Sequence, residues 1–183
     1  MLLLFQGHST IDTARMYNHG ATEEMLGALR SKNPHLRALR IDSKANAFKD
    51  YNKDLSPANV LRQSESTLGA LKEEAVNVFY LHAPDHNTPI EETLEAVQQL
   101  YAAGKFKYFG LSNYAAWQVV LIWSLCREKG YVLPTVYQGM YNAITRNVEE
   151  ELFPALRKCG MSKLTYTVSS PSPRSLRSLF MIQ

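Results

Sequence analysis

The chain has 183 residues, enough for one domain with a sizeable hydrophobic core. Hydrophobic residues make up 45% and charged residues 20% of it, as in an ordinary globular protein, and the net charge is only +3. The Lys and Arg residues are scattered rather than gathered in a stripe, which argues against a nucleic-acid partner. No apolar run approaches the roughly 18 residues of a membrane span, and no signal peptide is recognised at the N-terminus. We therefore expect a cytoplasmic protein with no membrane partner.

Five short segments read as β-strands. Several are nearly continuous apolar runs, which is typical of parallel strands that are buried on both faces. In chain order the predicted strands are Ser9–Thr13, Leu39–Ala45, Val76–Ala83, Tyr108–Asn113 and Thr135–Tyr141.

Helical patterns lie between these strands. The first has Ser56 as its N-cap and Pro57 at the first helical position, and the second opens on a capping box from Thr88 to Glu91. The apolar positions of the second helix are Ile90, Leu94, Val97 and Tyr101, and those of the third are Trp117, Val120, Leu121 and Leu125. A fourth helix is predicted from Asn147 to Gly160, with Val148, Leu152 and Leu156 on one face.

The alternation of strand and helix at intervals of about 30 residues indicates repeated βαβ units. An open doubly wound sheet and a β/α barrel both fit this alternation. No GxGxxG follows any predicted strand, which favours the barrel. We expect the barrel domain to cover residues 1–168, and the Ser/Pro/Arg-rich residues 169–183 to form a disordered tail.

The strand ends carry a regular series of polar residues. Asp12, Lys44, His82, Ser112 and Gln138 are separated by 32, 38, 30 and 26 residues, so each step is one βα unit. Active sites of β/α barrels lie at the carboxyl ends of the strands. The spacing therefore predicts that all five side chains reach the same rim.

These side chains suit one kind of chemistry. A buried Lys44 needs a counter-ion, for which Asp12 is the natural candidate. The ammonium group favours the phenolate form of Tyr17 and makes its hydroxyl a better proton donor, while His82 can orient a carbonyl oxygen. Such a group suits protonation of an oxygen that gains negative charge as a hydride reaches the adjacent carbon. Ser112, Asn113 and Gln138 are then expected to contact a cofactor. The two cysteines, Cys126 and Cys159, belong to no CxxC or Cys/His cluster, so they indicate free thiols and no metal site.

The motifs resemble those of the aldo-keto reductases. They are Ile11-Asp12-Thr13-Ala14 with Tyr17, Lys44 after an apolar strand, Phe79-Tyr80-Leu81-His82, Gly110-Leu111-Ser112-Asn113-Tyr114 and Val136-Tyr137-Gln138. The runs Tyr80–His86 and Gln138–Ala143 are similar to the aflatoxin B1 aldehyde reductase branch of that family. The resemblance extends from about residue 7 to about residue 160.

The resemblance implies NADPH-dependent reduction of aldehydes and ketones, without metal or flavin. It implies that Tyr17 is the proton donor, that Lys44 activates Tyr17, that Asp12 is the partner of Lys44 and that His82 orients the carbonyl group. Ser112, Asn113 and Gln138 would hold the nicotinamide carboxamide, and Tyr166 would stack on the nicotinamide ring. Met140 and Tyr141 would lie near the substrate pocket. Dimers are common in this branch.

The chain also departs from the family pattern, because the family's first and last strands have no counterpart here. We therefore predict an α/β fold that is a partial (β/α)8 TIM barrel with about five to six of the eight parallel strands. An unclosed sheet exposes strand edges, which are prone to pairing with another chain. The alternative function is accordingly a catalytically inactive truncated product, or an interaction module that uses its exposed sheet edges, including self-association.

Overall fold

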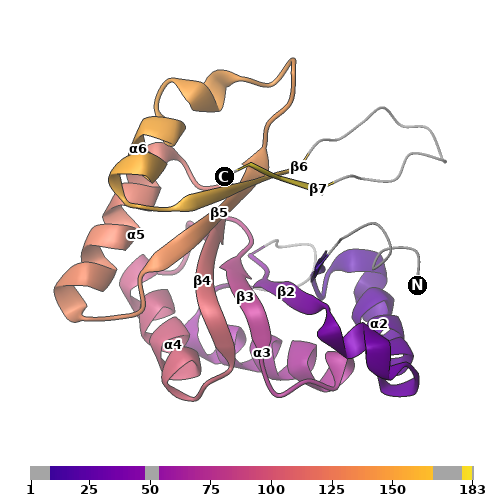
Figure 1. The fold of residues 1–183 in the computed structure, drawn as a ribbon. Helices are drawn as coiled ribbons and strands as arrows, with labels where there is room; N and C mark the ends of the chain where they lie inside the picture. The colour runs from indigo at the N-terminus through magenta and orange to yellow at the C-terminus, as the bar shows by residue number, and fades with distance from the viewer. Residues whose placement is uncertain (1–8, 48–53, 167–178, 183) are drawn as a thin grey trace. The chain divides into compact units, whose positions relative to one another are not determined.

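The structure is a computed structural model that describes residues 9–47, 54–166 and 179–182 (Figure 1). The chain forms two compact units, Met1–Tyr108 and Phe109–Gln183. The five predicted strands are all present, and each begins and ends within two residues of its predicted bounds.

Three parallel strands form the sheet of the first unit. They are β1 (Thr10–Asp12), β2 (Arg40–Ala45) and β3 (Val76–Leu81), and β2 pairs with both of the others. The register sets Asp12 beside Asp42 and Lys44 beside Tyr80. Because side chains alternate along a strand, these four residues share one face of the sheet, and Ser43 belongs to the opposite face.

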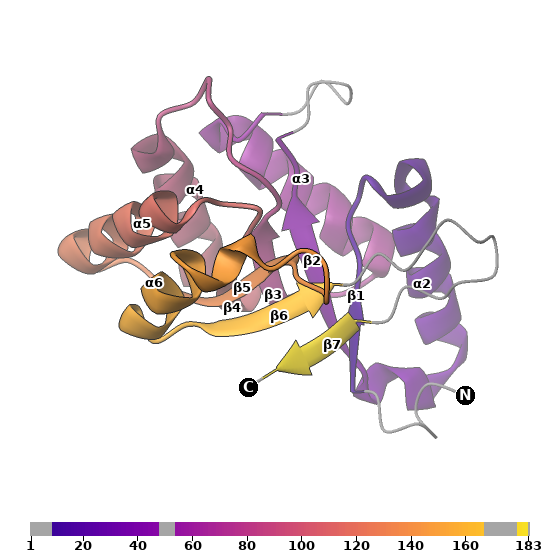
Figure 2. The same ribbon diagram turned by 90° about the horizontal axis from the view of Figure 1, so that it is seen from above.

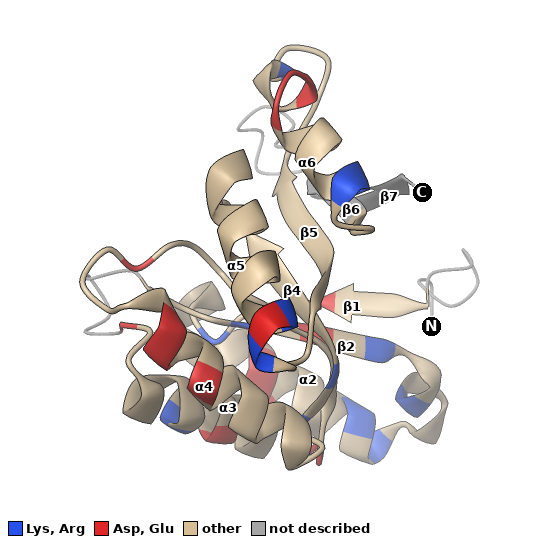
Figure 3. Ribbon diagram, turned by 90° about the vertical axis from the view of Figure 1, so that its left-hand side faces the viewer, with Lys and Arg blue, Asp and Glu red and all other residues tan. Residues whose placement is uncertain are grey.

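Helices follow each strand of the first unit. They are η1 (Tyr17–Gly20), α2 (Ala21–Lys32), η2 (Pro34–Ala38), α3 (Pro57–Leu71) and α4 (Ile90–Ala102). α2 and α3 pack side by side, and α3 also contacts β2 and α4 (Figure 2). Figure 3 shows the acidic positions of α4, of which Glu91 and Glu92 lie in its first turn, where they complement the positive end of the helix dipole.

Ser56 is the N-cap of α3, with Pro57 at the first helical position, as predicted, whereas the N-cap of α4 is Pro89 and not Thr88. The Ser56 hydroxyl donates to Asp54 Oδ1 at 2.5 Å, and the Thr88 hydroxyl donates to Asp85 Oδ2 at 2.6 Å, so neither hydroxyl bonds a backbone group of a helix end. Asp85 also accepts the backbone N–H groups of Leu55 and Asn87. Carboxylates are stronger acceptors than hydroxyl groups, and here they redirect both hydroxyls from the helix ends to the loops.

The second unit continues the same succession. The end of β4 (Phe106–Ser112), from Phe109 on, pairs in parallel with β5 (Pro134–Met140), which pairs in parallel with β6 (Ser162–Tyr166). Its helices are α5 (Ala116–Lys129), η4 (Asn147–Glu149) and α6 (Leu152–Lys158), and Leu152 and Leu156 of α6 are buried. Parallel strands that alternate with helices in both units are the fold class predicted from the sequence, a partial (β/α)8 barrel.

Two features of the second unit differ from expectation. Residues Leu179–Ile182, inside the segment predicted to be disordered, form β7, which pairs antiparallel with β6. All four are apolar residues in the sequence, and such residues are common in β-strands. The remainder of that segment lies outside the described residues.

The buried face of α5 is also not the predicted one. Val119, Ile122 and Cys126 are buried, whereas Trp117 is 67% exposed and Val120 and Leu121 are also exposed. α5 has apolar residues on several faces, so spacing alone could not identify the side that packs.

Within the described residues, no helix is long and apolar enough to cross a membrane.

Candidate active site

Lys44 and Asp12 form a buried ion pair at the carboxyl end of the first unit's sheet. The Lys44 side chain is fully buried, and its Nζ donates to Asp12 Oδ2 at 2.7 Å and to the Thr13 carbonyl oxygen at 2.8 Å. The pairing of β1 with β2 brings the two residues to neighbouring strands. A buried ammonium group is tolerated only with such partners, so the ion pair expected from the sequence holds Lys44 in one position.

Tyr17 lies directly beside this pair. Lys44 Nζ is 5.2 Å from the centroid of the Tyr17 ring. The residues that follow have left-handed backbone conformations, with φ of 49° at Asn18, 52° at His19 and 96° at Gly20. The Arg15 guanidinium group braces this turn by donating to the Gly20 carbonyl oxygen at 2.7 Å. The turn thus places Tyr17 near Lys44, and it does so with backbone conformations that are unfavourable for residues other than glycine.

His82 follows β3 and completes the group. Its ring is buried, with its centroid 6.2 Å from that of Tyr17 and the two planes at 79°. Burial, together with the nearby charge of Lys44, lowers the pKa of His82 to about 3. The imidazole is therefore neutral at physiological pH, and one of its nitrogens carries a proton while the other is an acceptor.

Asp42 is a buried acid that the sequence analysis did not assign. It is 2% exposed and shares a face of β2 with Lys44. Its Oδ1 accepts the Asn77 side-chain amide at 2.7 Å and the Val78 backbone N–H at 3.1 Å. Burial raises the pKa of Asp42 to about 6, although the bond from Asn77 opposes this change. Nothing in the sequence around Asp42 indicated that its carboxyl group would be buried.

We expect Asp42→Asn to stabilise the first unit at neutral pH. The folded-state pKa of about 6 exceeds the ordinary value of 3.8, so the folded protein binds more protons between these values and stability falls as pH rises through this window. Removing the charge should raise the free energy of unfolding by about 2 kcal/mol at pH 7.5, with no gain near pH 4. Urea unfolding of both proteins across this range measures the difference.

Asp54→Asn is the matched control for that experiment. Hydrogen bonds from Ser56 and Asn59 lower the pKa of Asp54, which is the opposite direction. Its replacement should therefore reduce stability at neutral pH. A gain at Asp42 that does not depend on pH would contradict the assignment of the effect to the buried charge.

A second polar cluster lies in the second unit, where β4 and β5 end. Ser112 pairs with Gln138 in the strand register, and both side chains are buried. Asn113 has φ of 62°, its side-chain amide donates to Ser112 Oγ at 3.1 Å, and its backbone N–H donates to the Gln138 carbonyl oxygen at 3.3 Å. Hydroxyl and amide groups together provide both donors and acceptors, so this cluster fits the carboxamide of a nicotinamide cofactor.

The remaining predicted site residues also belong to the second unit. Met140 is 41% exposed at the end of β5. The Tyr141 hydroxyl donates to Glu149 Oε1 at 2.5 Å, which raises the pKa of Tyr141, and its ring packs edge-on to Phe153. Tyr166 ends β6, but its side chain lies outside the described residues. Their roles toward substrate and cofactor therefore stay predictions.

The structure thus brings Asp12, Tyr17, Lys44 and His82 together in the first unit, and Ser112, Asn113 and Gln138 together in the second. The Thr13 carbonyl oxygen, which anchors Lys44, was not predicted, because a backbone acceptor leaves no mark on the sequence. Over the described part of the chain, no group of three or more His, Cys, Asp or Glu side chains is placed to hold a metal ion.

A buried Asp–Lys pair beside a tyrosine and a neutral histidine, at the ends of parallel β/α strands, agrees with the sequence comparisons. The aldo/keto reductase family model matches residues 2–170, and the chain belongs to this family. It is 51% identical over 160 residues to aldo-keto reductase family 7 member A3 of Homo sapiens, covering 86% of this chain and 47% of that protein.

Two further relatives from Homo sapiens have a similar sequence identity to this chain. Aflatoxin B1 aldehyde reductase member 2 is 49% identical over 89% of this chain and 45% of its own length. Aflatoxin B1 aldehyde reductase member 4 is 49% identical over 89% of this chain and 49% of its own length. The chain therefore spans about half the length of these relatives.

Proposed function

We propose that this chain serves the NADPH-dependent reduction of aldehydes and ketones to alcohols, with Tyr17 as the proton donor. The observation that carries the proposal is the position of Lys44, whose ammonium group bonds the Asp12 carboxylate and lies 5.2 Å from the centroid of the Tyr17 ring. Membership of the aldo/keto reductase family supports oxidoreduction of a carbonyl group. The buried ion pair also favours this proposal over a non-catalytic interaction module. Burying two charges carries a desolvation penalty, and an interaction through sheet edges does not require them.

The residues of the first unit would act on the carbonyl oxygen. The Tyr17 hydroxyl donates its proton to that oxygen, and Lys44 stabilises the phenolate that remains. Asp12 and the Thr13 carbonyl oxygen hold Lys44 in place. The neutral His82 ring orients the carbonyl oxygen through its N–H group. When bound, NADPH supplies the hydride.

The residues of the second unit would bind the cofactor and the substrate. Ser112, Asn113 and Gln138 hold the carboxamide of the nicotinamide, and Tyr166 stacks on its ring. Met140 and Tyr141 border the substrate pocket. Aldehydes are the substrate class that we propose, since two of the relatives are named aflatoxin B1 aldehyde reductases. Homodimer formation and a cytoplasmic location stay predictions.

A titration of the full chain with NADPH tests this proposal. The fluorescence of Trp117 and Trp123, both on α5, should change as the cofactor binds. Addition of a small aromatic aldehyde should then oxidise the NADPH in proportion to the alcohol formed. A preparation that is folded by circular dichroism but neither binds NADPH nor reduces the aldehyde would refute the proposal for this chain.

We expect Gln138→Met to weaken NADPH binding by about tenfold, because it removes the amide that contacts the carboxamide while preserving side-chain volume. The dissociation constant from the fluorescence titration measures the effect. Gln99→Met, at an exposed position of α4, is the control and should leave the dissociation constant unchanged. Unaltered binding by the Gln138 variant would remove this residue from the proposed cofactor site.

A further inference from the structure

A second buried acid of the first unit has no role in the proposed chemistry. Glu23 lies in the first turn of α2 and has no exposed surface. Its Oε1 accepts a hydrogen bond from the Ser43 hydroxyl at 2.6 Å. Burial raises the pKa of Glu23, although the hydroxyl groups of Ser43 and Thr67 oppose this change. Burying a carboxyl group costs free energy, so an apolar side chain would be more favourable at this position if the residue only filled space.

The two ends of this hydrogen bond lie next to the two central residues of the site. α2 begins directly after η1, the turn that carries Tyr17. Ser43 immediately precedes Lys44 in β2, and its side chain points to the face opposite that of Lys44. The bond between Glu23 and Ser43 therefore connects the segment that carries Tyr17 to the strand that carries Lys44.

The segment that carries Tyr17 needs such a connection. Three successive residues, Asn18 to Gly20, have positive φ, and two of them are not glycine. Such conformations persist only where the surrounding contacts impose them. Arg15 braces the turn at Gly20 and also pairs with Glu24, whose side chain is 62% exposed. The Glu23–Ser43 bond is fully buried, so solvent does not compete for it.

We propose that Glu23 is a positioning residue of this site, whose hydrogen bond to Ser43 holds the turn of Tyr17 at a set distance from Lys44. The proposal rests on the proposed function, because the distance matters only if Tyr17 and Lys44 act together. Glu23 touches neither of them through a hydrogen bond. It acts through α2 on one side and β2 on the other.

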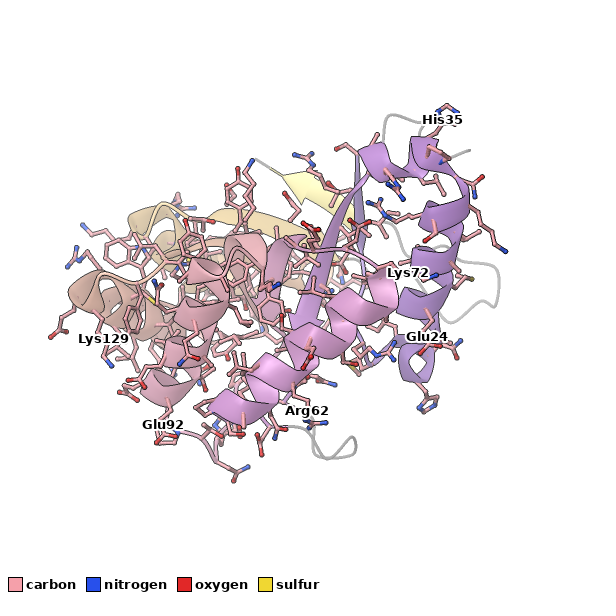
Figure 4. All side chains as sticks on the ribbon, turned by 90° about the horizontal axis from the view of Figure 1, so that it is seen from below. Glu24, His35, Arg62, Lys72, Glu92 and Lys129 are labelled. Atoms are coloured by element: carbon pink, nitrogen blue, oxygen red, sulfur yellow. The ribbon has the colours of Figure 1, made fainter. Side chains whose placement is uncertain are left out.

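The test compares three variants with the unaltered full chain. Ser43→Ala removes the donor at the cost of a single oxygen atom, and Glu23→Leu removes the acceptor at nearly constant volume. Glu23→Gln retains an oxygen that can accept from Ser43 and is therefore the conservative rescue. Glu92→Gln is the control, since Glu92 is an exposed acid in the first turn of another helix of the same unit, α4 (Figure 4).

The first readout needs no turnover. In the chain labelled with carbon-13 tyrosine, the NMR signal of the Tyr17 ring is identified by its loss in Tyr17→Phe. We expect this signal to move by more than its line width in Ser43→Ala and in Glu23→Leu, because the ring shifts relative to the Lys44 charge. It should stay in place in Glu23→Gln and in Glu92→Gln. A purely structural role would change stability and leave the signal of the folded chain unmoved.

The second readout is the reduction of a small aldehyde. Ser43→Ala should lower kcat by about tenfold with an unchanged KM, because a misplaced donor slows the chemical step rather than binding. If the unaltered chain shows no turnover but the Tyr17 signal moves as expected, the proposed function fails and the positioning role stands. If Glu23→Leu does not fold, Ser43→Ala decides alone. An unmoved Tyr17 signal in folded Ser43→Ala overturns the proposal.

Discussion

Replacing Tyr17 with Phe should lower kcat for aldehyde reduction by about a thousandfold, within the range expected for loss of a general acid. The substitution removes only the hydroxyl group, and the ring that packs against His82 and Lys44 remains. Without the proton donor, negative charge on the carbonyl oxygen has no group to neutralise it as the hydride arrives. Steady-state rates at saturating NADPH and aldehyde measure the loss.

Two comparisons isolate this effect. Binding of NADPH, followed by tryptophan fluorescence, should be the same in Tyr17→Phe as in the unaltered chain. Tyr101→Phe, which alters an exposed tyrosine of α4, should leave kcat unchanged. Should Tyr17→Phe retain more than about a tenth of the original kcat, another group donates the proton and the proposed role of Tyr17 is wrong.

Gly27→Ala should destabilise the first unit by about 3 kcal/mol. A Cβ at Gly27 would lie 2.1 Å from the Ala70 carbonyl oxygen and 2.9 Å from the Leu71 carbonyl carbon. Both are backbone atoms of α3, so no side-chain rotation relieves the overlap and α2 must move away from α3. Urea unfolding measures the loss, which should exceed the gain of about 1 kcal/mol that Ala brings to a helix.

Gly69→Ala is the matched control on the partner helix. A Cβ at Gly69 meets no atom within 4 Å, so only the gain in helix propensity remains. This variant should be more stable than the unaltered chain by about 0.5–1 kcal/mol. If the two variants shifted the free energy of unfolding in the same direction, the close packing of α2 on α3 would not be the cause. Because α2 begins directly after η1, the turn that carries Tyr17, Gly27→Ala should also reduce turnover.

The polar side chains at the strand ends were accessible to prediction because their positions repeat. Asp12, Lys44 and His82 follow successive strands, and register alone brings Asp12 and Lys44 to neighbouring positions. The residues that support them are different. Asp42 and Glu23 gain their importance from burial, and a carboxyl group in a sequence gives no sign of whether water reaches it.

Local hydrogen bonds were predicted less well than the elements that they border. Ser56 is the N-cap residue of α3 and Thr88 precedes the N-cap of α4, yet the hydroxyl group of each donates to a nearby carboxylate instead of to the helix end. The Tyr141 hydroxyl donates to Glu149, a contact that the sequence did not indicate. In each case several partners were within reach along the chain, and small differences in geometry selected one.

The amino-acid sequence by itself determined the order of the first five strands, the family and the set of candidate catalytic residues, because apolar periodicity and motif spacing are properties of the chain alone. Only the tertiary structure decided which face of α5 is buried and that Leu179–Ile182 pairs with β6. It also decided that Lys44 donates hydrogen bonds to both Asp12 and the Thr13 carbonyl oxygen. It also decided that Glu23 is bonded to Ser43. The physical reason is that burial and hydrogen bonding between distant segments depend on packing, and packing is set by the whole fold rather than by any local stretch.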